Sequence, residues 1–150
     1  AVFWCKPNPD PDRAGIISIS TAGEDRTKGL RFFREGSATS QRFKLNVGTG
    51  AAETWNDGST VDAPYDSWIH LAFTVSGTAC TIYINGEVAL TSDLPAVIDW
   101  TGCDAISIGS GAPNFSYWNH NSDLSYYDEM RFFNKALTQQ EIQTIIAAED

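Results

Sequence analysis

Residues 125–148 constrain the fold more than any other stretch of the chain. Across 127–133 we expect successive side chains to point to alternate faces, and a period of two is typical of a β-strand that lies in a sheet. The alternation predicts two faces, namely Tyr127, Glu129, Arg131 and Phe133 on one side and Asp128, Met130 and Phe132 on the other. The last strand of a sheet is therefore expected here.

A short helix is predicted directly after this strand. Thr138-Gln139-Gln140-Glu141 has the form of a capping box, in which the Thr138 hydroxyl and the Glu141 carboxylate satisfy each other's free backbone N–H groups. Ile142, Ile145 and Ile146 then follow at helical spacing. They give the helix one apolar stripe that can pack on the sheet.

The rest of the chain is divided into short strands by turn residues. Asn85-Gly86 predicts a type I′ turn, and Gly77-Thr78 predicts a hairpin. The other expected strands are 2–6, 15–20, 29–34, 42–47, 68–75, 80–85, 88–90 and 104–108. This pattern predicts one all-β domain over 1–150, a two-sheet antiparallel β-sandwich with one short C-terminal helix.

Three segments resemble the laminin-G-like, concanavalin A-like family, and they occur in the order of the family. They are FWCKP (3–7), the hairpin of SWIHLAFT (67–74) with YING (83–86), and the closing series DEMRFFNKALTQQEI (128–142). The resemblance spans nearly the whole chain and implies a jelly-roll sandwich. It does not specify a ligand, because this fold hosts many functions.

The resemblance implies three further properties. Many members hold a structural Ca²⁺ with an acidic residue at the position of Asp128, and carbonyls from the start of the chain complete the site. Members usually have further strands before FWCKP, so we expect this chain to be part of a longer multidomain protein. RTKGLRFFREG (26–36), KLNVGTG (44–50) and SGAPNFSYWNH (110–120) also resemble domains of marine Bacteroidetes surface glycan-binding proteins. That likeness implies an extracellular or cell-surface location.

The charge of the chain excludes some partners. Nineteen acidic residues against ten basic ones give a net charge of −9, which argues against a nucleic acid. No apolar run is long enough for membrane insertion. Six of the ten basic residues fall within 26–44, namely Arg26, Lys28, Arg31, Arg34, Arg42 and Lys44. We expect solvated strand edges and loops there, with contact to a ligand as the alternative.

The cysteines and histidines suggest structural roles. Cys5 and Cys80 share strand faces with apolar residues, so both are expected to be buried thiols. A disulfide that involves Cys103 is an open alternative in an oxidising compartment. His70 lies within a predicted strand, which favours a packed, hydrogen-bonded histidine over a catalytic one.

No catalytic motif is found. Laminarinase-type hydrolases of this fold have Glu-x-Asp-x-x-Glu on one strand, which brings two carboxylates to one face, and this chain has no such series. Asp128 and Glu129 are adjacent, so the alternation places them on opposite faces. Neither G-x-S-x-G nor H-E-x-x-H occurs. The sequence therefore predicts a protein that is not an enzyme.

The loop 111–123 is the strongest candidate for a binding site. It combines aromatic rings, which stack on the C–H face of a sugar, with amides and carboxylates, which bind adjacent hydroxyls. The candidate residues in this loop are Trp118, Asn119, His120, Asn114, Tyr117 and Asp123. Trp55 in a second polar loop is another candidate, and Arg34 and Glu35 could add hydrogen bonds if their strand lines the same face.

These residues predict a non-catalytic domain that binds a polysaccharide or oligosaccharide. The acidic net charge favours a neutral β-glucan over an anionic glycan. Two alternatives stay open. One is a protein–protein adhesion module on a cell surface or phage particle, and the other is a structural module without a ligand. If the loop has only a structural role, Tyr117 and Trp118 cap one end of the core.

Overall fold

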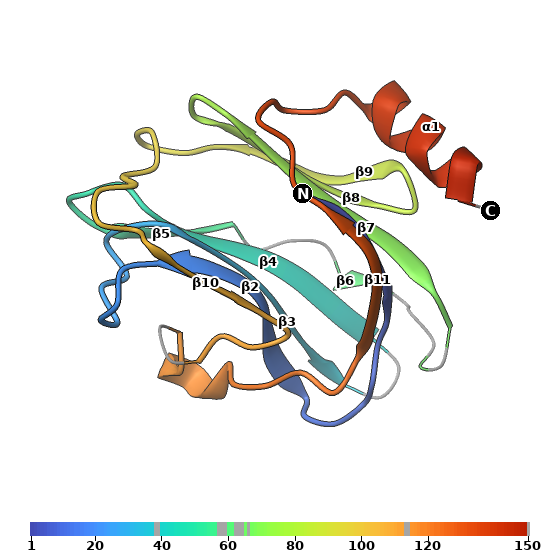
Figure 1. The fold of residues 1–150 in the computed structure, drawn as a ribbon, viewed down its shortest axis with the longest axis horizontal. Helices are drawn as coiled ribbons and strands as arrows, with labels where there is room; N and C mark the ends of the chain where they lie inside the picture. Colours follow the sequence, from blue (N-terminus) through green and yellow to red (C-terminus); the bar gives the residue numbers. More distant parts are fainter. Residues whose placement is uncertain (38–39, 57–59, 62–64, 66, 113–114, 150) are drawn as a thin grey trace.

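The fold is a sandwich of two antiparallel sheets, seen in a computed structural model that describes residues 1–37, 40–56, 60–61, 65, 67–112 and 115–149 (Figure 1). The elements are β1 (Val2–Lys6), β2 (Arg13–Ser20), β3 (Leu30–Ser37), β4 (Ser40–Gly48), β5 (Glu53–Asn56), β6 (Thr60–Val61), β7 (Ile69–Ser76), β8 (Ala79–Ile84), β9 (Glu87–Asp93), β10 (Ala105–Ile108), η1 (Tyr117–Asn119), β11 (Tyr126–Arg131) and α1 (Gln139–Glu149). The five-stranded sheet has the order β11-β1-β7-β8-β9. The six-stranded sheet has the order β10-β2-β3-β4-β5, with β6 paired to β4. The predicted fold class is confirmed.

The hydrophobic core lies between the two sheets, because one face of each strand turns its apolar residues inward. Phe3 and Phe32 are fully buried and meet across the core with their ring centroids 6.0 Å apart. Phe32 also packs against Phe73 of β7, at 5.0 Å. The core therefore joins strands that lie far apart in the sequence.

The predicted turn and helix start are confirmed. Asn85 and Gly86 have φ of 50° and 78°, as a type I′ turn requires, and they join β8 to β9. At α1 the Thr138 N–H donates to the Glu141 carboxylate over 2.9 Å, and the Glu141 N–H donates to the Thr138 hydroxyl over 3.3 Å. The helix covers the outer face of the five-stranded sheet, where Ile142 packs against Val2 and its neighbours.

The predicted faces of the last strand are wrong, because β11 contains a β-bulge. Its pairing with β1 changes register between Trp4↔Asp128 and Val2↔Arg131, which inserts one extra residue into β11. Glu129 takes φ of 48° there. As a result Tyr127 and Met130 both pack on the core. The strand also ends at Arg131, short of the predicted residue 133.

Several smaller predictions have mixed outcomes. Cys5 and Cys80 are buried, as expected, and Cys103 forms no disulfide with either of them. His70 is fully buried, but its two ring nitrogens lack a hydrogen-bond partner among the described residues, so the expected hydrogen bond is absent. The basic stretch is not simply a solvated one, because Arg31 and Arg34 are fully buried. In the part of the chain that the structure describes, no helix has the length and apolar character to cross a membrane.

Candidate functional site

The described part of the loop 111–123, residues 111–112 and 115–123, lies against the outer face of the six-stranded sheet (orange in Figure 1). Phe115 and His120 form its buried underside, with their rings stacked at 4.8 Å and both packed on Phe33 of β3. The backbone of the loop approaches β2 so closely that a Cβ on Gly15 would lie 2.2 Å from the backbone nitrogen of Gly111. The backbone at Gly111 is therefore packed directly against β2.

His120 fixes the loop by polar contacts. Its Nε2 lies 2.9 Å from the Glu35 carboxylate and its Nδ1 lies 3.1 Å from the Tyr117 carbonyl. Burial lowers the pKa of His120, while these two acceptors act in the opposite direction. Glu35 also pairs with Lys44 over 3.0 Å. His120 and Glu35 thus support the loop from below.

Tyr117, Trp118 and Asn119 form the exposed tip of the loop. The side chains of Tyr117 and Trp118 are 45% and 57% exposed, and their rings stand at 78° to each other with centroids 4.9 Å apart. Trp118 and Asn119 have φ of 62° and 63°, in the left-handed region that bulky residues rarely adopt. Such strain persists only where the surroundings enforce it.

Glu24 and Arg26 hold the residues that directly precede this strained backbone. The Glu24 carboxylate accepts the backbone N–H groups of Ser116 and Tyr117 over 2.7 and 2.8 Å. The Tyr117 N–H is the main reason that the pKa of Glu24 lies below its usual value. The Arg26 guanidinium lies over the Tyr117 ring, 4.0 Å from its centroid. The two aromatic rings are thus presented in a fixed orientation.

The other predicted site residues divide between the surface and the interior. Trp55 lies in β5 instead of the expected loop, and its 38% exposed ring packs edge-on against Phe33. Arg34 and Asp123 face the interior, where they form a fully buried ion pair of 2.8 Å. Asn114 lies outside the described residues. The structure therefore brings Trp55, Tyr117, Trp118 and Asn119 to the surface and places Arg34 and Asp123 beneath it.

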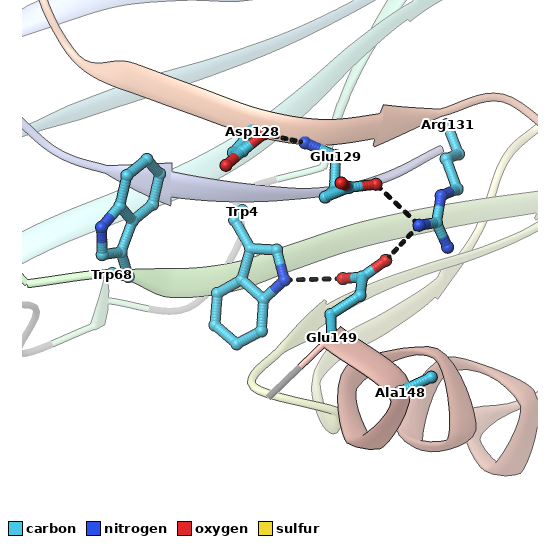
Figure 2. A pocket seen from close by; sticks show the side chains of 7 residues that line it. All are labelled: Trp4, Trp68, Asp128, Glu129, Arg131, Ala148 and Glu149. Carbon is cyan, nitrogen blue, oxygen red and sulfur yellow. Dashed lines mark hydrogen bonds and ion pairs between the residues drawn. The ribbon is translucent and has the colours of Figure 1, made fainter.

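A second candidate site is a pocket of about 500 Å³ on the other layer of the sandwich (Figure 2). Its lining comes from β1, β11, the start of β7 and the end of α1, namely Trp4, Trp68, Asp128, Glu129, Arg131, Ala148 and Glu149. The sheet register explains this grouping. Trp4 pairs with Asp128 on one side and with His70 on the other, so Trp68, two residues before His70, shares the same outer face.

The pocket contains a chain of charged contacts, drawn in Figure 2. The Arg131 Nη2 atom lies 2.7 Å from both the Glu129 and the Glu149 carboxylates. Glu149 also accepts the indole N–H of Trp4 over 2.6 Å. Pairing with Glu129, the larger effect, and the charge of Glu149 raise the pKa of Arg131. Arg131 is thus committed to the protein's own carboxylates.

Asp128 and Glu129 line this one pocket, so the expectation that they point to opposite faces is wrong. The bulge is the reason, because the left-handed conformation of Glu129 turns its side chain outward next to that of Asp128. The alternation of side chains therefore no longer argues against Asp128 and Glu129 acting as a pair of carboxylates. The lack of a Glu-x-Asp-x-x-Glu series is unaffected.

Asp128 is also the predicted ligand of calcium, which prefers six to eight oxygen atoms. Its carboxylate is exposed and accepts the backbone N–H of Glu129 over 2.9 Å. Among the described residues, no three His, Cys, Asp or Glu side chains converge as a metal site would require. Asp128 could hold a calcium ion only together with carbonyl or water oxygens, and calcium stays a prediction.

Trp4, Trp68, Glu129 and Glu149 were not predicted as site residues. One signal was available, because Trp4 and Trp68 each lie in a segment that resembles the family. Their meeting depends on strand register, and the position of Glu149 depends on how α1 docks. Neither can be inferred from local sequence.

Solved structures with the same fold come from several kinds of protein. A candidate carbohydrate-binding protein of Bacteroides ovatus ATCC 8483 has a TM-score of 0.65 and 16% identity, over 95% of this chain and 38% of that one. A SAP-like pentraxin of Limulus polyphemus has a TM-score of 0.67 and 13% identity, over 96% and 68%. The CBM40 of a Ruminococcus gnavus IT-sialidase, bound to α2,3-sialyllactose, has a TM-score of 0.66 and 13% identity, over 96% and 79%.

At these identities the likeness concerns the fold alone. The chain spans little more than a third of the Bacteroides ovatus protein. No curated protein sequence matches the chain significantly. A family model does match, however, and it covers residues 1–143. The chain therefore belongs to the Concanavalin A-like lectin/glucanases superfamily, as the resemblance of its sequence implies.

Proposed function

We propose that this is a non-catalytic carbohydrate-binding domain that captures a polysaccharide or oligosaccharide with the tip of the loop 111–123. The observation that carries this proposal is the exposed aromatic pair of Tyr117 and Trp118, of which Trp118 has a strained, left-handed backbone. A domain gains no core packing from rings that are 45% and 57% exposed, and yet Trp118 is held at φ of 62°. Strain of this kind clusters at ligand-binding sites.

The tip offers the two kinds of contact that sugars need. The faces of Tyr117 and Trp118 can stack on pyranose C–H groups, and the exposed amide of Asn119 can bind neighbouring hydroxyls. Trp55 extends the apolar surface on the same sheet. The buried groups Arg34, His120 and Asp123 would act by positioning this surface.

The net charge of −9 favours a neutral glycan, and we propose a β-glucan as the ligand class. The family supports a lectin-like role, as does the sialyllactose bound by the Ruminococcus gnavus module. A polysaccharide ligand would place the domain outside the cell or on its surface, within a longer parent protein.

The proposal is tested by calorimetric titration with β-glucan, mannan and alginate oligosaccharides. We expect one neutral class to bind and Trp118→Ala to weaken it about tenfold, because the aromatic contact, roughly 0.5–1.5 kcal/mol, and the apolar area that the ring buries together reach the ~1.4 kcal/mol that a tenfold change requires. Trp100→Ala is the matched control, since Trp100 is 48% exposed and lines a separate pocket with Val75, Val97 and Ile98. A folded protein that binds none of the glycans would favour the adhesion or structural module instead.

A further inference from the structure

The pocket of Figure 2 combines aromatic walls with an excess of negative charge. Trp68 is 47% exposed, and Trp4 forms the neighbouring wall. Three carboxylates, those of Asp128, Glu129 and Glu149, face one guanidinium, that of Arg131. The lining therefore has a formal charge of −2.

Arg131 does not make the pocket a site for anions. Its Nη2 atom already pairs with Glu129 and Glu149 at 2.7 Å each. An anion would have to displace these carboxylates and would meet Asp128 as well. A cation meets the opposite situation, because it can approach Asp128 without breaking either pair.

A bare metal ion fits the pocket poorly. Metal ligands must converge on one point at short distance. Among the described residues no three acidic or imidazole side chains do so, although three carboxylates line this pocket. Carboxylates spread around a hollow of about 500 Å³ suit a larger, polyatomic cation.

A buried histidine lies next to the pocket without lining it. The His70 ring packs edge-on with that of Trp4, and the ring centroids are 5.2 Å apart. Both of its ring nitrogens are buried without a hydrogen-bond partner among the described residues. Buried polar atoms of this kind are uncommon and require an explanation, such as a bound group or water.

We infer that this pocket binds a protonated amino group on a ring, and we name the amino sugars as its ligand class. The indoles of Trp4 and Trp68 attract the cation through their π-systems and accept the apolar face of the ring. Asp128 supplies the counter-charge. A neutral sugar could use the tryptophans but would leave the excess negative charge uncompensated.

This site is independent of the loop proposed above. The pocket is lined by residues on the outer face of the five-stranded sheet. The described part of the loop lies on the outer face of the six-stranded sheet (Figure 1). The two proposals therefore fail separately. If the loop proposal is wrong, Trp118→Ala leaves glycan binding unchanged. If the pocket proposal is wrong, the experiment below shows it.

The test compares a fully deacetylated chitosan trisaccharide with its fully N-acetylated counterpart by calorimetric titration in mildly acidic buffer. The two ligands share the same ring and differ at the nitrogen, which is a charged ammonium group in one and a neutral acetamide in the other. We expect the deacetylated ligand to bind at least about tenfold more tightly, the ratio that ~1.4 kcal/mol of cation–π and ion-pair energy gives. Binding should also weaken with added salt, because the Debye length falls from about 30 Å at 0.01 M to about 8 Å at 0.15 M.

Two variants locate the binding. Trp68→Ala removes one wall, and Asp128→Asn removes a charge at constant shape; both side chains are exposed, so both proteins should fold. Each is expected to weaken binding about tenfold, while Trp100→Ala, at equal exposure, leaves it unchanged. Equal affinity for the two trisaccharides, or binding that neither variant alters, would overturn the inference. So would binding that occurs only with added Ca²⁺.

Discussion

Replacement of Asp123 by asparagine tests how the loop 111–123 is held to the sandwich. The Asp123 carboxylate is fully buried and accepts hydrogen bonds from Arg34, from the Ser125 N–H and hydroxyl, and from the Tyr127 hydroxyl. Burial alone would raise its pKa, but the hydrogen bonds and charge of Arg34 lower the pKa below its usual value. The ionised carboxylate is therefore the form that the fold requires.

The cost of Asp123→Asn follows from what remains in the interior. Arg34 has no exposed surface, and the variant leaves its guanidinium charge facing two neutral amide oxygens, that of the new asparagine and Oε1 of Gln41, 3.2 Å away. Breaking one half of a buried pair costs about 3–5 kcal/mol, out of a total stability of about 5–15 kcal/mol. Replacement of both partners, in Arg34→Met with Asp123→Leu, should cost much less than the sum of the single changes.

Urea denaturation measures these differences as shifts of the midpoint at constant slope. The matched control is Asp12→Asn, because Asp12 forms an exposed pair with Arg13 at 3.7 Å, and such pairs contribute about 0–1 kcal/mol. If Asp123→Asn cost less than about 1 kcal/mol, the assignment of this pair as the anchor of the loop would be refuted.

Three further predictions concern other parts of the chain. Burial, together with the charge of Arg131, lowers the pKa of His70 from 6.5 to about 4, so the unfolded state binds a proton first as the pH falls. Stability should therefore decline from about pH 6.5 to about pH 4, by roughly 3 kcal/mol at most, and His70→Phe should reduce this decline in urea titrations at each pH. Thr138→Ala removes the helix cap and should cost about 1 kcal/mol, whereas Thr138→Ser should cost little, by the same assay. If Asp128 holds calcium, EGTA should lower the melting temperature of protein purified without chelator; the absence of stoichiometric Ca²⁺ would end that idea.

The features that the sequence predicts correctly are encoded within a few residues. Asn85-Gly86 is sufficient for the turn, since both residues tolerate positive φ. Thr138 and Glu141 are sufficient for the helix start, because the capping box closes within one turn. Order and spacing of such signals then favoured a sandwich, and the family match confirms it.

The features that the sequence does not predict depend on partners far along the chain. Arg34 appeared to be a surface residue because its buried partner Asp123 lies 89 positions away. The pocket could not be predicted from local sequence, because it is the strand register that brings Trp4 and Trp68 together. The bulge at Glu129 has no local signal, since glycine, the residue that usually marks such a conformation, is not present there.

The described residues other than glycine with positive φ are Asn85, Trp118, Asn119 and Glu129. The hairpin turn accounts for Asn85, and the other three lie at the two candidate sites, which is where strain is expected to persist. Substitutions of Glu129 allow the energy of this backbone strain to be measured. Glu129→Ala loses the pair with Arg131 and keeps the strained backbone, whereas Glu129→Gly loses the same pair and relieves the strain. Glycine should thus be more stable than alanine by roughly 1 kcal/mol here, the reverse of the usual order within a strand. If alanine proves more stable in urea, the left-handed conformation is not a strain held for the pocket.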